Sequence, residues 1–166
     1  MTTEVKQGDS SIILEKLPSK SIDLVVTSPP YKDEDGYTDQ LIESVFRQVY
    51  RLQKQSTLLF LNFGHLAGFK SRPFKVVSML EKIGYDLNDT ITWIKPQYRP
   101  LQGNKRLNNV TEFIFLFSKG KMPVIDRMAI GVPYDDKTNV TRYAKGIDLK
   151  CPGNAWLIGY ETIQKS

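Results

Sequence analysis

The chain has 166 residues, of which 40% are hydrophobic and 25% charged, a composition typical of one globular domain and not of a disordered segment. It contains no apolar run of the roughly 18 residues that a membrane helix needs and no apolar signal-peptide core, so we expect a cytoplasmic protein that has no membrane partner. One cysteine and one histidine exclude an internal disulfide and a thiolate or histidine-rich metal site, while the net charge of +5 permits nucleic-acid binding without demonstrating it.

The first predicted elements are a strand and a helix. The apolar run at 22–27 is typical of a buried strand. A polar loop follows, and apolar residues spaced three and four positions apart then predict a helix that ends near Leu52. Either Thr38 or Asp39 is suitable as the cap at the start of this helix.

The middle of the chain predicts three more strands and one more helix. Short apolar runs indicate strands at 57–63, 89–95 and 110–118. The intervening helix is predicted at 72–83, because a proline stands in its first turn and Gly84 follows its last residue.

The order strand, helix, strand, helix, strand, strand is that of an α/β fold. Because the first two connections cross over through a helix, we expect a mainly parallel sheet with an antiparallel strand pair. From residue 119 onward the periodicity fades into a polar, basic and irregular tract. We therefore divide the chain into 1–118 and 119–166.

The motif Ser28-Pro29-Pro30-Tyr31 directly follows the first predicted strand. Ligands of open α/β sheets bind beyond the carboxyl ends of the strands. Proline has a carbonyl but no N–H, so the Ser28 hydroxyl and the Pro29 carbonyl offer hydrogen-bond acceptors on a stiff backbone. Such a pair suits a planar amine with two N–H groups, as on cytosine or adenine, and Tyr31 would stack on the base. The structural alternative is a Pro-Pro turn beside an incidental tyrosine.

The stretch GDSSIILEKLPSKSIDLVVTSPPY resembles the opening of the amino-methyltransferases of DNA, in the subgroup whose catalytic motif precedes the cofactor motif. The resemblance extends over nearly the whole chain, through LLFLNFG, DTITWIKP, NNVTEFIFLFSKG and GNAWLIGYETIQ. It implies an incomplete Rossmann-like methyltransferase fold. In this fold 1–118 would be the catalytic half, and 119–166 a candidate target-recognition region together with the start of the C-terminal half.

The resemblance also implies an activity, which is the transfer of a methyl group from S-adenosyl-methionine to cytosine N4 or adenine N6 of a base flipped out of DNA. The serine form of the motif favours cytosine, since the aspartate form is commoner among the adenine enzymes. The catalytic residues implied are those of the motif at 28–31, and Asp9 and Ser10 are implied to border the cofactor pocket.

The glycine-rich cofactor motif of this family, Asp-x-Phe-x-Gly-x-Gly, is not found in the sequence. We therefore expect this chain to be inactive or nearly so by itself, as a fragment, as a subunit of a split enzyme or as a degenerate relative. An exposed sheet edge, where neighbouring strands of the fold would lie, favours a separate chain that supplies the cofactor-binding half, or self-association.

Residues that would contact DNA are predicted at two places. Tyr37 stands in the loop that, by the resemblance, becomes ordered over the flipped base. The connection between the last two predicted strands is basic, as is common at phosphate contacts, although a solvated surface loop is the equal alternative. The basic residues there are Lys95, Arg99, Lys105 and Arg106.

Two other functions stay open from the sequence. One is a non-catalytic nucleic-acid-binding module or regulatory subunit derived from the same fold. The other is methylation of amines in RNA or protein, because related Pro-Pro-aromatic sites serve those substrates. Cys151 precedes a proline where carbon-5 cytosine methylation needs the reverse order, so we assign it no catalytic role.

Overall fold

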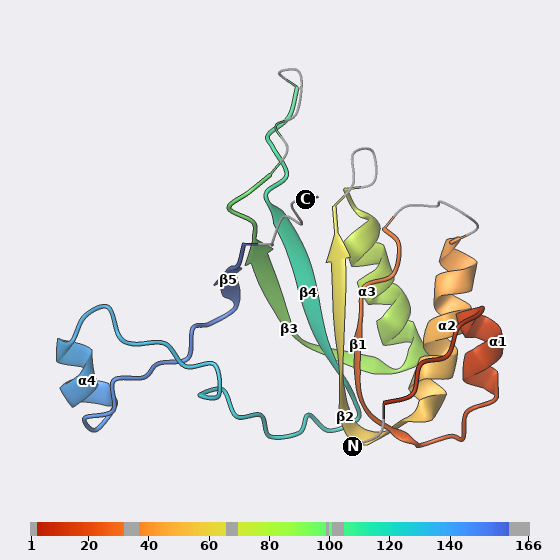
Figure 1. Cartoon of the computed structure of the whole chain (residues 1–166), viewed down its shortest axis with the longest axis horizontal. Helices are drawn as coiled ribbons and strands as arrows, with labels where there is room; N and C mark the ends of the chain where they lie inside the picture. Colours follow the sequence, from red (N-terminus) through yellow and green to blue (C-terminus); the bar gives the residue numbers. More distant parts are fainter. Residues whose placement is uncertain (1–2, 32–36, 66–69, 99, 101–104, 160–166) are drawn as a thin grey trace.

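The computed structural model of the chain describes residues 3–31, 37–65, 70–98, 100 and 105–159 (Figure 1). Its helices are α1 (Ser10–Glu15), α2 (Asp39–Leu52), α3 (Arg72–Ile83) and α4 (Thr138–Tyr143). Its strands are β1 (Ile22–Thr27), β2 (Gln53–Gly64), β3 (Tyr85–Ile94), β4 (Thr111–Lys119) and β5 (Ala155–Leu157).

The five strands form one mixed sheet in the order β1-β2-β4-β3-β5. The pairs β1–β2 and β3–β5 are parallel, whereas β4 is antiparallel to both of its neighbours, β2 and β3. Four of these strands therefore run in one direction, and β4 is reversed between them (Figure 1). This arrangement confirms the predicted α/β fold with a mainly parallel sheet and an antiparallel component.

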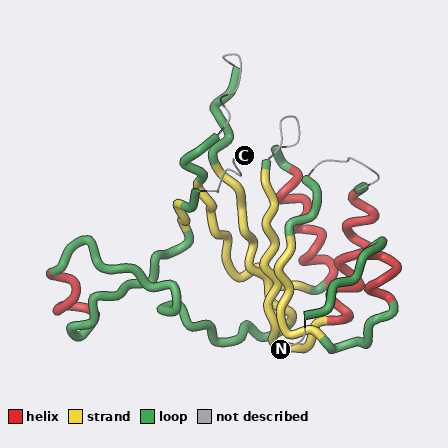
Figure 2. Tube along the Cα trace, viewed as in Figure 1, coloured by secondary structure: helices red, strands yellow, loops and turns green. Residues whose placement is uncertain are grey.

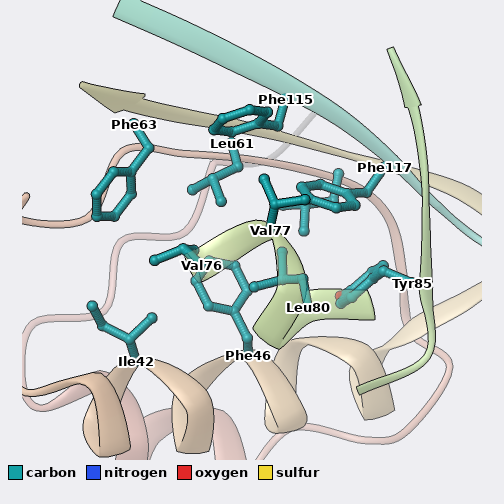
Figure 3. Close-up of a cluster of buried hydrophobic side chains, with 11 residues drawn as sticks. Ile42, Phe46, Leu61, Phe63, Val76, Val77, Leu80, Tyr85, Phe115 and Phe117 are labelled. Atoms are coloured by element: carbon teal, nitrogen blue, oxygen red, sulfur yellow. The ribbon is translucent and has the colours of Figure 1, made fainter. Parts of the chain in front are cut away.

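The hydrophobic core lies between the sheet and helices α2 and α3, which cover the same face of it (Figure 3). Apolar side chains of both helices point at apolar side chains of β2 and β4, and burial of each large one contributes about 1.5–3 kcal/mol. Because the two central strands supply most of the sheet side of this core, their position is fixed by packing as well as by backbone hydrogen bonds. The members at its centre are Ile42, Phe46, Val76, Leu80, Leu59, Leu61, Phe63, Phe115 and Phe117.

The helix boundaries follow the predicted local signals. Thr38 caps α2 through its side chain, which accepts a hydrogen bond from the Leu41 amide at 3.2 Å. Pro73 stands in the first turn of α3, where its missing N–H leaves no helical hydrogen bond unmade. Gly84 ends α3 at a φ of 122°, which is outside the range that other residues readily adopt.

Strands β2 and β3 each begin four residues before the predicted start. The early part of β2 is polar and contains a bulge, since Ile22 pairs with Gln53 but Leu24 pairs with Leu58. The early part of β3 has the buried Tyr85 but no continuous apolar run, and it is held by pairing with the end of β4. Backbone pairing extends both strands through residues that have no apolar pattern, which is why the sequence understated their length.

Residues 120–154 leave the sheet as an extended arm that contains α4 and an isolated bridge between Val132 and Lys150 (Figure 1). The chain then returns to the sheet, where β5 pairs with β3. Neither α4 nor β5 was expected from the irregular sequence of this tract. The division of the chain between residues 118 and 119 stays a prediction. Strand β5, from the second part, joins the sheet that the first part forms. None of the helices in the described ranges has both the length and the apolar character needed to cross a membrane.

Candidate functional site

The motif at 28–31 lies where four strand ends meet. It follows the carboxyl end of β1, and the pairing of the strands brings Asn62 near the end of β2 and Glu112 near the start of the reversed β4 to the same edge. Lys95 directly follows β3 at this edge. Figure 2 shows these strand ends side by side along the upper edge of the sheet. Ligand sites of open α/β sheets occur at such an edge.

A hydrogen-bond network joins these four strand ends. The Ser28 hydroxyl lies 3.1 Å from Tyr31 Oη and 3.2 Å from Asn62 Oδ1. The Tyr31 hydroxyl lies 2.7 Å from Asn62 Oδ1 and 2.9 Å from Glu112 Oε2, both of which are acceptors. Glu112 in turn forms an ion pair with Lys95. The motif at 28–31 is therefore tied to Asn62 and Glu112, which the sequence analysis did not single out, and through Glu112 to Lys95.

The Tyr31 ring is held on its face as well as at its hydroxyl. It packs against Phe63 with ring centroids 5.0 Å apart and an interplanar angle of 36°. Gly64 lies beside it so closely that a Cβ at that position would be 2.7 Å from Tyr31 Cε2. Burial, and to a smaller degree the Glu112 carboxylate, raises the pKa of Tyr31 to about 12, so this hydroxyl keeps its proton at neutral pH.

The predicted acceptor pair is open to solvent. Ser28 is exposed and Pro29 is half-buried. Within the described part of the chain the Pro29 carbonyl accepts no hydrogen bond, and neither Pro29 nor Pro30 has an N–H to donate. The end of β1 thus presents two oxygen acceptors to any ligand that reaches this edge.

Arg72, the first residue of α3, holds the backbone on both sides of the segment 32–36. Its Nη1 donates to the Tyr31 carbonyl at 3.1 Å, and its Nη2 donates to the Tyr37 carbonyl at 3.3 Å and to Asp39 Oδ1 at 3.0 Å. The Arg72 side chain is buried, being 8% exposed. Tyr37, predicted to contact the base, is thereby fixed relative to the motif at 28–31 by one guanidinium group.

Sequence reasoning missed Asn62, Glu112 and Arg72. The signal for the first two was a polar residue in an otherwise apolar strand: Asn62 near the end of TLLFLNFG and Glu112 near the start of TEFIFLF. The signal for Arg72 was a charged residue at the start of a helix, directly before Pro73 and Phe74. None of these signals names a partner, because the contacts join residues 31 to 81 positions apart.

A cavity of about 420 Å³ opens beside the motif, between α1, β1 and α2. It contains Ser10, the motif residues 28–30 and Tyr37 in its lining, together with apolar side chains of β1 and α2. Asp9 is not part of this lining: it is exposed and caps α1, and hydrogen bonds from the Ser11 hydroxyl and amide lower the pKa of Asp9. A second hollow, of about 490 Å³ between α2 and α3, has no motif residue in its lining.

The predicted basic residues divide into two groups. Lys105 and Arg106 are exposed in the connection between β3 and β4, whose described parts extend beyond the sheet edge in Figure 1. Lys95 is instead engaged inside the protein, paired with Glu112 and 5.3 Å above the Trp93 ring. Arg99 lies outside the described residues.

Comparison with known proteins gives one consistent set of matches. Residues 22–165 match the family N6_N4_Mtase, described as DNA methylase. The type II methyltransferase M.SfiI of Streptomyces fimbriatus is 29% identical over 81% of this chain and 40% of its own length. M.PvuII of Proteus hauseri is 30% identical over 78% of this chain and 45% of its own length. The chain thus spans less than half the length of these two relatives.

Solved structures match over most of the chain. The PvuII DNA methyltransferase, described as cytosine-N4-specific, has a TM-score of 0.64 and 26% identity, and the match covers 95% of this chain and 58% of that one. TTHA0409 of Thermus thermophilus, a putative DNA modification methylase complexed with S-adenosyl-L-methionine, has a TM-score of 0.60 and 21% identity over 90% of this chain and 66% of that one.

Proposed function

Since the chain belongs to the DNA methylase family N6_N4_Mtase, we propose that it carries the half of a DNA amino-methyltransferase that holds the target base, with cytosine N4 preferred to adenine N6. The observation that carries this proposal is the pair of open acceptors, Ser28 Oγ and the Pro29 carbonyl, at the carboxyl end of β1. An exocyclic amine has two N–H groups to donate to such a pair.

The acceptor pair explains how the amine becomes reactive. The lone pair of a base amine is delocalised into the ring, which makes it a poor nucleophile. Two acceptors on one side draw both hydrogens toward themselves and favour a pyramidal nitrogen whose lone pair faces away from Ser28 and Pro29. The surplus proton of the methylated amine passes to water, so the chain needs no strong general base at this edge.

Cytosine is preferred on two grounds. The motif begins with serine, the form commoner among cytosine-N4 enzymes, at Ser28. The PvuII methyltransferase, 26% identical over the matched region, is described as cytosine-N4-specific. Tyr31, held by Phe63, would support the face of the base, and stacking on an aromatic ring contributes about 1–3 kcal/mol per base.

S-adenosyl-methionine is the cofactor that we propose, and when bound it supplies an electrophilic methyl group. The cavity beside the motif fits a part of it, because the apolar lining suits an aliphatic chain and the lining includes both Ser10 and Ser28. Among the described residues, no acidic side chain lines this cavity to bind ribose hydroxyls. Asp9, already engaged by Ser11, would lie at its border and contribute little alone.

DNA is the proposed substrate, and its target base must leave the duplex, which costs a few kcal/mol. Tyr37, which lies at the other end of segment 32–36 from the motif, would help to hold the flipped base. The exposed Lys105 and Arg106, with Arg99 in the same connection, would contact phosphates. The tract 119–166 is the proposed target-recognition region together with the start of the C-terminal half.

The outer edge of β1 is the proposed place for a cofactor-binding partner. Among the described strands only β2 pairs with β1, so the other edge has backbone donors and acceptors free. Leu24 and Val26 on this strand are 54% and 72% exposed. We propose that a separate chain with the cofactor-binding half adds at this edge, and self-association there is the alternative outcome. Sedimentation of the chain alone and with a supplied half distinguishes the two.

The test of the function is methyl transfer to DNA by the chain, alone and with a supplied cofactor-binding half. Labelled methyl groups are counted, and mass spectrometry of the hydrolysed DNA tells N4-methylcytosine from N6-methyladenine. We expect Ser28→Ala to lose about 100-fold or more of the complemented rate, as when one preorganised hydrogen bond to a transition state is removed.

Ser44→Ala is the matched control, since Ser44 is exposed on the outer side of α2. Equal rates for Ser28→Ala and Ser44→Ala would show that the acceptor pair is wrongly assigned. DNA binding with no methyl transfer in any combination would instead favour the non-catalytic nucleic-acid-binding module.

A further inference from the structure

The hydroxyl groups of Ser28 and Tyr31 share one acceptor, Asn62 Oδ1, and Tyr31 has a second acceptor in Glu112. Asn62 Oδ1 lies within hydrogen-bond distance of both hydroxyls, and Glu112 Oε2 lies 2.9 Å from Tyr31 Oη. Each hydroxyl has one proton to donate and lone pairs to accept with. The directions of the two hydroxyl protons therefore decide whether Ser28 is a hydrogen-bond donor or an acceptor toward a ligand.

The orientation of the Asn62 amide follows from its other contact. Asn62 Nδ2 donates to the Phe113 carbonyl at 3.0 Å. A reversed amide would set its oxygen against that carbonyl oxygen, so the network assigns Oδ1 to the side of Ser28 and Tyr31. Asn62 is consequently an acceptor toward both hydroxyl groups.

The Tyr31 proton is directed away from Ser28. Its two acceptors lie at 2.7 Å and 2.9 Å, nearer than Ser28 Oγ at 3.1 Å, and one of them is a carboxylate held by Lys95. Hydrogen bonds to an ionised acceptor are stronger than those between neutral groups. Ser28 Oγ therefore faces two oxygen atoms, Tyr31 Oη and Asn62 Oδ1, that both have lone pairs toward it.

We propose that Asn62 is a positioning residue that takes the Ser28 hydroxyl proton inward, so that Ser28 Oγ meets the base only as an acceptor and the site rejects keto bases. This inference rests on the proposed function of Ser28. With the proton turned outward, three oxygen atoms would face one another inside the protein with no proton between Ser28 and its neighbours. With the proton turned inward, the outer face of Ser28 Oγ has lone pairs alone.

The inward direction of the Ser28 proton makes the site specific for an amine. An exocyclic amine donates one N–H to Ser28 Oγ and one to the Pro29 carbonyl. A keto oxygen at the same place, as in uracil, thymine or guanine, would meet two acceptors and no proton. Asn62 touches no part of the base in this arrangement and acts through Ser28.

Neutron diffraction from crystals of the deuterated chain tests the proton direction without any activity. We expect the Ser28 deuteron to lie toward Asn62 Oδ1, and a deuteron on the solvent side or one directed at Tyr31 Oη overturns the inference. This result is independent of methyl transfer: an inward deuteron in a chain that never methylates DNA contradicts the proposed function alone.

The specificity is tested by NMR titration of the full chain with deoxycytidine monophosphate and deoxyuridine monophosphate. We expect the wild type to favour the cytidine nucleotide by roughly tenfold, and Asn62→Leu to reduce this ratio to near one, because a freed Ser28 proton can then turn outward. Ser28→Ala should abolish the preference as well.

Asn88→Leu is the matched control, since Asn88 donates to Ser118 Oγ far from the motif, and it should keep the wild-type ratio. Thermal unfolding checks that each variant is folded. A ratio that Asn62→Leu leaves unchanged contradicts the inference, and the deuteron position decides it where Asn62→Leu does not fold.

Discussion

Arg72 binds the carbonyl of Tyr31 from 41 positions away in the sequence, with an Nη1–O distance of 3.1 Å. The same guanidinium binds the Tyr37 carbonyl and Asp39. The motif at 28–31 and the start of α2 are therefore joined to the start of α3 by one buried side chain. This contact makes the position of Tyr31 depend on the packing of α3 and not only on the end of β1.

Replacing Arg72 by methionine should destabilise the fold and misplace the motif. The variant keeps an apolar stem of similar length and loses hydrogen bonds to three acceptors. We expect the free energy of unfolding to fall by about 2 kcal/mol, allowing for the solvent exposure of Asp39. Urea denaturation measures the change.

Arg47→Met is the control for this variant. Arg47 is exposed on α2 and pairs with Glu43 one turn away, an interaction that contributes about 0.5 kcal/mol or less. Equal losses of stability in the two variants would contradict the role given to Arg72.

Replacing Gly64 by alanine should displace the Tyr31 ring. The added Cβ would be 2.7 Å from Tyr31 Cε2, closer than real contacts allow, and a tight 3.1 Å from Glu112 Cγ. Overpacking of this kind costs about 1–3 kcal/mol of stability. In a Tyr31→Ala background, where the ring is gone, the same change should cost less, and urea denaturation of the four proteins measures the difference. Identical costs in both backgrounds would exclude a clash with the ring.

The stability of the protein should depend on the ionisation of Tyr31 at alkaline pH. Burial raises the pKa of Tyr31 to about 12, whereas a tyrosine in an unfolded chain titrates near pH 10. Because the folded state holds the proton more tightly, this stabilisation is complete below about pH 10 and is lost as the pH rises toward about 12.

The measurement is the free energy of unfolding of wild type and Tyr31→Phe between about pH 9 and 12. We expect the wild type to lose stability more steeply across this window. Tyr85, whose pKa burial also raises, is present in both proteins and cancels in the difference. Parallel curves would contradict the raised pKa of Tyr31.

The two groups of basic residues should differ in their effect on DNA affinity. The double variant Lys105→Ala with Arg106→Ala should weaken binding to duplex DNA. The negative slope of log K against log salt should become shallower by about 0.9 for each phosphate that the variant no longer neutralises. Lys95→Met should leave that slope unchanged, because its ammonium group pairs with Glu112.

Lys75→Ala with Lys82→Ala provides the control for charge, since both lysines are exposed on α3. The salt dependence is measured by fluorescence anisotropy at several salt concentrations. If the pair on α3 changes the slope as much as Lys105 and Arg106 do, the effect is one of net charge and not of a contact.

Local signals in the sequence were sufficient for most of the fold. The strand at 22–27 and the helix at 72–83 have the predicted boundaries, and Thr38 caps α2 as expected. Each of these features depends on residues that are close together in the sequence. The beginnings of β2 and β3 have no continuous apolar run and were missed because pairing with distant strands determines them. The whole of α4 and β5 was missed because the path of the arm and the pairing with β3 determine these elements.

For the candidate site, the sequence by itself determined the chemistry of the strand end: two prolines remove two donors, and a serine and a tyrosine flank them. Only the tertiary structure decided how those groups are held. Tyr31 and Glu112 are 81 positions apart and meet because β4 is reversed between β2 and β3, which brings its start to the edge where β1 and β2 end. A hydrogen bond needs its two atoms within about 3 Å. Spacing along the chain does not determine such a distance, whereas the register of neighbouring strands does.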